Sequence, residues 1–115
     1  MPTFARFALS LSLILSAFSV NAGNTSTGTL SLVHFMKDGV VAMTTSGQHN
    51  AVAGDDACTQ LQPGHWALDA TTAEGKAQLS GLLIAYSTGK SIVIHGTGVC
   101  DVHPSRETVN YFYLH

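Results

Sequence analysis

The fold of this chain is decided by residues 71–95, which read TTAEGKAQLSGLLIAYSTGKSIVIH. The segment opens with the Ser/Thr-x-x-Glu capping box with which helices begin. Apolar side chains then follow at the i, i+3, i+4 and i+7 spacing of one helix face, namely Leu79, Leu82, Leu83 and Tyr86. Gly89 is typical of the left-handed residue that ends a helix. This pattern predicts a helix at about residues 72–88, followed at once by a strand at 91–95.

A second face of the predicted helix carries small residues at a spacing of four. These residues are Ala73, Ala77, Gly81 and Ala85. Their small side chains allow another element to approach the helix closely. Two interpretations follow: the face packs on the sheet of its own domain, or it meets a helix of another subunit. For the second interpretation we select Ala77, Gly81 and Ala85 as an oligomer contact face.

Strand-like segments lie on both sides of the predicted helix. Apolar and β-branched residues form short runs at 29–36, 40–45, 65–70, 91–95 and 108–114. Asp38-Gly39 lies between the first two runs and favours the positive φ angles of a hairpin turn. We therefore expect a fold that is mainly β with one α-helix, a small OB-like antiparallel barrel with the helix packed across it. A chain of 115 residues holds one such domain, placed at residues 23–115.

Residues 1–22 have the pattern of a signal peptide. Arg6 provides the positive n-region, residues 7–18 are mostly apolar, and Val20-Asn21-Ala22 fits the cleavage pattern. The alternative is a retained anchor, but the apolar stretch is too short to span about 30 Å of hydrocarbon. We expect cleavage before Gly23, no membrane span afterwards, and a secreted or periplasmic protein. Residues 23–28 are polar, which predicts a loose N-terminal segment.

The chain has two cysteines, Cys58 and Cys100. In an oxidising compartment an even cysteine count predicts a disulfide, and two cysteines allow one pairing. A redox-active or metal-binding pair is the alternative, but the Cys-x-x-Cys spacing typical of such pairs is absent.

The charge of the chain excludes some classes of function. Charged residues make up 10% of the sequence, and the formal net charge is −2. A nucleic-acid-binding domain usually carries a basic stripe, which is missing here. The sequence also lacks the Gly-x-Ser-x-Gly and His-Glu-x-x-His motifs of hydrolases. We expect no enzyme activity and no cofactor.

Histidines and aromatic residues supply the remaining candidate sites. The sequence has six histidines, and His95, Asp101 and His103 are weak candidates for a metal site because they lie close together in the chain. Tyr111 and Tyr113 fall on one face of the strand at 108–114, and with Trp66 they are candidate binding residues. Both faces of this strand are largely apolar, which indicates that one of them meets another subunit.

The order of these features resembles a known family. Cys58 and a strand with Trp66 precede the helix, which ends in Ser87-Thr88-Gly89-Lys90; the run Ser91-Ile92-Val93-Ile94, then Cys100 and an aromatic strand follow. This layout resembles the B subunits of the subtilase-cytotoxin and typhoid-toxin type, within the pertussis-like AB5 toxins. The resemblance covers most of residues 23–115 and is residue by residue over about 79–94.

The resemblance implies an OB-fold, a ring of five subunits, binding to cell-surface glycans and no catalysis by this chain. The helices of such rings face a central pore, which suits Ala77, Gly81 and Ala85. No local motif carries over the sugar-contacting residues of the family. We therefore expect a secreted, non-enzymatic homo-oligomer that binds a glycan or a protein partner, as a toxin B subunit or a non-toxin relative. The alternative is a monomeric metal-binding or enzyme-inhibitor protein of the same compartment.

Overall fold

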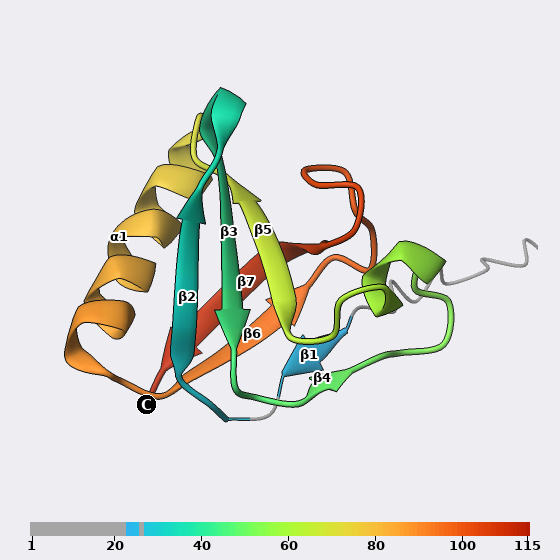
Figure 1. Ribbon diagram of the computed structural model, residues 1–115, viewed down its shortest axis with the longest axis horizontal. Helices are drawn as coiled ribbons and strands as arrows, with labels where there is room; N and C mark the ends of the chain where they lie inside the picture. The colour runs from blue at the N-terminus through green and yellow to red at the C-terminus, as the bar shows by residue number, and fades with distance from the viewer. Residues whose placement is uncertain (1–22, 26) are drawn as a thin grey trace, which may run out of the picture.

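The computed structural model describes residues 23–25 and 27–115, so the predicted signal peptide lies outside the described residues. The described chain forms one curled, seven-stranded sheet, a half-barrel, with helix α1 packed against it (Figure 1). The strand order is β2-β3-β5-β7-β6-β1-β4. The elements are β1 (Asn24–Thr25), β2 (Leu30–Phe35), η1 (Lys37–Gly39), β3 (Val40–Thr45), β4 (His49–Asn50), η2 (Ala57–Gln60), β5 (His65–Asp69), α1 (Ala73–Thr88), β6 (Ile92–Gly96) and β7 (Glu107–Leu114). The predicted fold class, a mainly β, OB-like structure with one helix, is confirmed.

The sheet is antiparallel except at one junction. β5 and β7 run parallel and pair over two positions, Trp66 with Glu107 and Ala67 with Thr108. Beyond Thr108, no strand of the described chain pairs with this side of β7, whose other side stays paired with β6. The sheet therefore opens along this edge of β7, and α1 lies across the opening.

The core fills the space between the curled sheet and α1. Its largest fully buried side chains include Trp66, Met43, Leu68, Leu82 and Ile94. Each large apolar side chain buried in this way contributes about 1.5–3 kcal/mol relative to an exposed position. Leu82 thus anchors the helix, whereas Leu83 and Tyr86 of the predicted apolar stripe remain 40% and 48% exposed.

The helix begins one residue later than the capping box predicts. Thr72 is the N-cap, and its Oγ1 accepts a hydrogen bond from the backbone N–H of Gly75 at 2.9 Å. The predicted cap, Thr71, instead donates from its N–H and hydroxyl to the Asp69 carboxylate. A Cβ on Gly75 would lie 1.7 Å from the Asp69 carbonyl oxygen, so the position that a capping-box glutamate would occupy accepts only glycine. Gly89 ends the helix with φ +66°, as expected.

A bulge interrupts the regular alternation of side chains in β2. Leu30 pairs with Thr45 and Leu32 with Thr44, so the register shifts by one residue between them. Leu30 is therefore buried while Leu32 is exposed, and Val33 packs against the core in its place. The following turn is as predicted, since Asp38 and Gly39 both have positive φ angles.

The expectation of a loose N-terminal segment is wrong. Gly23 and Thr25 are buried, and Asn24 pairs with Asn50 of β4 and His95 of β6. Thr25 Oγ1 also accepts a hydrogen bond from the Ile94 N–H at 3.0 Å. The polar side chains of β1 gave no strand signal in the sequence, because in the folded chain they satisfy backbone groups inside the sheet.

In the described part of the chain, no helix combines the length and apolar character needed to cross a membrane.

Candidate functional site

An exposed row of aromatic rings crosses β6 and β7. His95 lies opposite Tyr111 in the sheet, and the two rings stack with centroids 4.5 Å apart and planes 9° from parallel. Tyr113 follows at 6.0 Å from His95, and His115 lies 5.3 Å from Tyr113. Tyr111 and Tyr113 are 50% and 47% exposed. We call His95, Tyr111, Tyr113 and His115 the aromatic row.

An open groove of about 370 Å³ lies beside the aromatic row, between β7 and α1. It is lined by Ala77, Gln78 and Gly81 from the helix and by residues 111–114 from the strand. Gln78 Nε2 donates a hydrogen bond to the Asn110 carbonyl oxygen at 2.8 Å, which ties the helix to the open edge of β7. Gly81 allows close packing, because a Cβ there would lie 3.3 Å from the Phe112 ring.

The groove brings together two sets of residues that the sequence analysis treated separately. Tyr111 and Tyr113 line it from the strand, and Ala77 and Gly81 line it from the helix. The third residue of the expected oligomer face, Ala85, is 1% exposed and belongs to the core. Its position one turn further along the helix brings it over the sheet, so it offers no surface for another subunit.

Trp66, the third candidate binding residue, is fully buried and offers no surface to a ligand. Its ring stacks on the imidazole of His49 at a centroid distance of 4.4 Å. His49 Nε2 lies 3.0 Å from Oε1 of Glu107, whose exposed fraction is zero. Glu107 Oε2 accepts a hydrogen bond from the Gly98 N–H at 3.2 Å. Sequence analysis missed this cluster, because β4, which carries His49, is too short to recognise by periodicity.

The protonation of His49 follows from its two partners. Its Nδ1 accepts a hydrogen bond from the Gly64 backbone N–H at 3.2 Å, so this nitrogen carries no proton. The proton therefore lies on Nε2, from which it is donated to the Glu107 carboxylate. His49 in this arrangement is a neutral imidazole and supplies no positive charge to Glu107.

A second, partly buried polar group consists of Arg106 and the nearby histidines His65 and His103. The Arg106 side chain is 8% exposed, and its Nε and Nη1 find no hydrogen-bond acceptor among the described residues. Burial lowers the pKa of Arg106. Burial and the Arg106 charge also lower the pKa values of His65 and His103, and His34 adds to the effect on His65.

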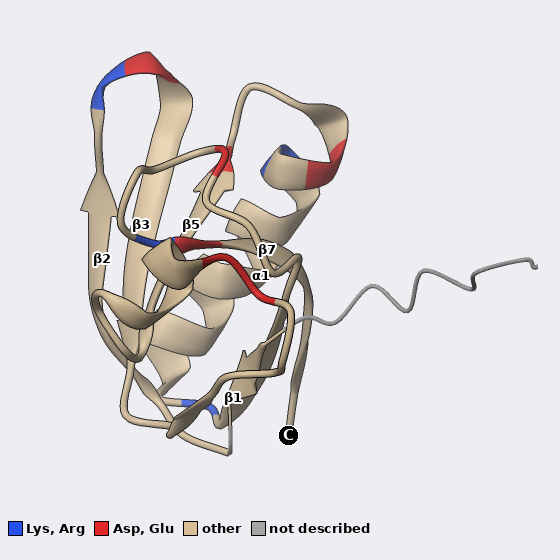
Figure 2. Ribbon diagram, turned by 90° about the vertical axis from the view of Figure 1, so that its right-hand side faces the viewer, with Lys and Arg blue, Asp and Glu red and all other residues tan. Residues whose placement is uncertain are grey.

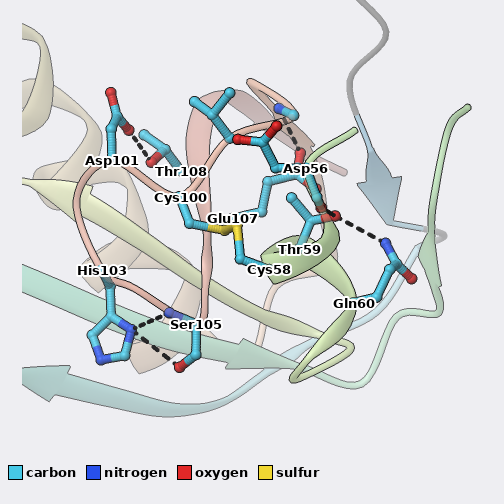
Figure 3. The surroundings of a disulfide bond; sticks show 12 residues. Asp56, Cys58, Thr59, Gln60, Cys100, Asp101, His103, Ser105, Glu107 and Thr108 are labelled. Carbon is cyan, nitrogen blue, oxygen red and sulfur yellow. Dashed lines mark hydrogen bonds between the residues drawn. A yellow bond between two sulfur atoms is a disulfide. The ribbon is translucent and has the colours of Figure 1, made fainter. Parts of the chain in front are cut away.

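Cys58 and Cys100 form the expected disulfide, with Cα atoms 6.4 Å apart (Figure 3). The bond joins η2 to the loop that follows β6. Backbone contacts support the same junction, since the Asp56 N–H donates to the Gly98 carbonyl oxygen at 2.8 Å. A disulfide of this kind indicates an oxidising compartment outside the cytoplasm.

The weak metal candidates do not converge. His95 belongs to the aromatic row, Asp101 accepts a hydrogen bond from the Thr108 hydroxyl, and His103 Nδ1 accepts one from the Ser105 N–H at 3.2 Å. Within residues 23–25 and 27–115, no group of three or more His, Cys, Asp or Glu side chains is placed to hold a metal ion.

The chain matches no protein-family model, no curated protein and no solved structure.

Proposed function

We propose that this protein is a secreted, non-enzymatic binding module that takes a glycan on the aromatic row and in the adjoining groove. The observation that carries the proposal is the pair of half-exposed tyrosines, stacked with His95 at the rim of an open groove. Exposed aromatic rings that lie next to one another form a contiguous apolar surface, and such surfaces mark interaction sites more often than single exposed residues do.

The chemistry of the site suits a sugar. The C–H face of a pyranose ring is apolar and packs flat on an aromatic ring. Tyr111 and Tyr113 provide such rings. Tyrosine hydroxyls, the His95 and His115 ring nitrogens and the Gln78 side chain provide polar groups around that surface. A mostly apolar groove with a few polar groups at fixed positions is the usual form of a small-ligand site.

We further propose that the module self-associates, as the AB5 resemblance implies. β2 is an edge strand of the sheet. Leu32 and Phe35 of this strand are 44% and 66% exposed, and Met36, which follows it, is 41% exposed. Figure 2 shows no charged residue along β2 until the turn that follows it. An exposed apolar edge without charges favours pairing with another chain.

Secretion or export to a periplasm completes the proposal. The disulfide between Cys58 and Cys100 requires oxidising conditions, and the signal-peptide pattern of residues 1–22 supplies a route to such a compartment.

Glycan binding is tested with the oxidised protein on a glycan array, followed by titration of the best glycan. Aromatic contacts of this kind contribute about 0.5–1.5 kcal/mol beyond their buried area. We therefore expect Tyr111→Ala and Tyr113→Ala each to weaken binding by about two- to twelvefold. Tyr86→Ala is the matched control, because Tyr86 is 48% exposed but lies outside both the row and the groove.

Two outcomes contradict the proposal. One is the absence of binding to any glycan by a protein with an intact disulfide. The other is that the Tyr111→Ala and Tyr113→Ala proteins bind the glycan as tightly as the Tyr86→Ala control does.

A further inference from the structure

Glu107 is a buried carboxylate without a cation. Its exposed fraction is zero, and its oxygens are met by the neutral imidazole of His49 and the N–H of Gly98. No lysine or arginine of the described chain forms an ion pair with it. A buried charge without an opposite charge destabilises the folded state strongly.

The backbone of Gly23 lies directly against this carboxylate. Gly23 is buried, and its carbonyl oxygen accepts a hydrogen bond from the Gly96 N–H at 2.8 Å. A Cβ on Gly23 would lie 2.5 Å from Glu107 Oε1 and 3.0 Å from His49 Nε2. The Gly23 nitrogen is bonded to the same Cα, at about 1.46 Å. Residue 23, whose nitrogen becomes a free amine if the chain is cleaved before it, thus packs against this buried carboxylate.

We propose that the new N-terminus created by cleavage after Ala22 is the missing partner: the α-ammonium group of Gly23 forms a buried ion pair with Glu107. The inference rests on the cleavage position expected from the sequence. In the precursor the Gly23 nitrogen is an uncharged amide. A signal peptidase adds one water across the Ala22–Gly23 bond, which leaves a carboxylate on Ala22 and an amine on Gly23. This amine takes up a proton at neutral pH, since α-amino groups have pKa values of about 7.7–8.0.

Maturation therefore adds a cation to the core of the domain. The folded mature chain gains an ion pair that the folded precursor lacks, so removal of the leader stabilises the fold. The geometry also explains the residue at the cleavage site. A side chain at position 23 would have to displace the Glu107 carboxylate, which favours glycine at the first position of the mature chain.

The test uses the secreted protein and a double-mutant cycle in urea. Intact mass first gives the natural N-terminus, and a start other than Gly23 overturns the proposal. Unfolding is then compared for chains that begin at Gly23 or carry Ala22 as one extra residue, each with Glu107 or Glu107→Gln. We expect the extra residue to raise the unfolding equilibrium constant at least tenfold in the chain with Glu107. In the Glu107→Gln chain we expect this increase to be at least threefold smaller. An equal effect in both backgrounds overturns the ion pair.

A second measurement needs no variant and decides the matter if Glu107→Gln fails to fold. The α-amine of the native protein is labelled with acetic anhydride, and its reaction rate is compared by peptide mass spectrometry with the rate in urea. Lys37, which is exposed at the turn after β2, serves as the internal reference. We expect at least tenfold protection of the α-amine relative to Lys37. An α-amine as reactive as Lys37 in the folded protein overturns the proposal.

Discussion

Arg106 illustrates how one side chain sets the properties of its neighbours. Its charge lies near His65 and His103, whose pKa values are lowered by burial first and by Arg106 second. We expect Arg106→Met to raise the pKa of both histidines toward their ordinary value, because one cause of the shift is removed and burial remains. An NMR titration of the ring protons measures this. Identical titration curves in the two proteins would contradict the assignment.

The same shifts fix the direction of a pH effect on stability. A histidine with a lowered pKa binds its proton less readily in the folded chain than in the unfolded chain. The contribution of His65 and His103 therefore makes the protein less stable as the pH falls below about 6.5. In the Arg106→Met protein this part of the acid destabilisation is smaller.

At the residue scale, sequence reasoning located side chains on strands better than it located buried ones. The parity of β7 placed Tyr111 and Tyr113 together, and both are exposed on one face as expected. Trp66 could not be assigned in this way, because both faces of β5 are covered. Glu107 gave no signal either, since its neighbours Gly23, His49 and Gly98 are remote in sequence.

Elements were predicted closely where their sequence signal was local. The bounds of α1, β3, β5 and β7 differ by at most one residue from those expected. The two-residue strands β1 and β4 were missed, because so short a segment has no periodicity. The parallel pairing of β5 with β7 was also missed, since it depends on contacts across about 40 residues of chain.

The start of α1 offers a test that separates the structure from the sequence pattern. Thr72 caps the helix, whereas the capping box assigns that role to Thr71. We expect Thr72→Ala to lower the free energy of unfolding by about 1 kcal/mol, the usual cost of losing an N-cap. Thr71→Ala, which removes one exposed hydrogen bond to Asp69, is expected to cost less. Urea denaturation of both variants ranks them, and the opposite order would favour the sequence pattern.

At the scale of the whole molecule, the exposed edge strand β2 predicts self-association. Light scattering on the oxidised protein is expected to give a mass near five subunits, as the AB5 resemblance implies. Phe35→Lys places a charge on the apolar edge and is expected to shift the protein toward the monomer. Val99→Lys is the control, because Val99 is 38% exposed but lies in the loop after β6. A monomeric native protein at high concentration would contradict the ring.

The place of β1 in the sheet has a consequence for biosynthesis. This strand lies between β4 and β6, and its Asn24 pairs with His95. β1, the first strand of the described residues, can therefore pair with β6 only after most of the chain has been synthesised. The hairpin of β2 and β3 has no such delay, because its strands are joined by a short turn. As the chain leaves the ribosome, the hairpin can form early, while the other end of the half-barrel closes only when the final strands have arrived.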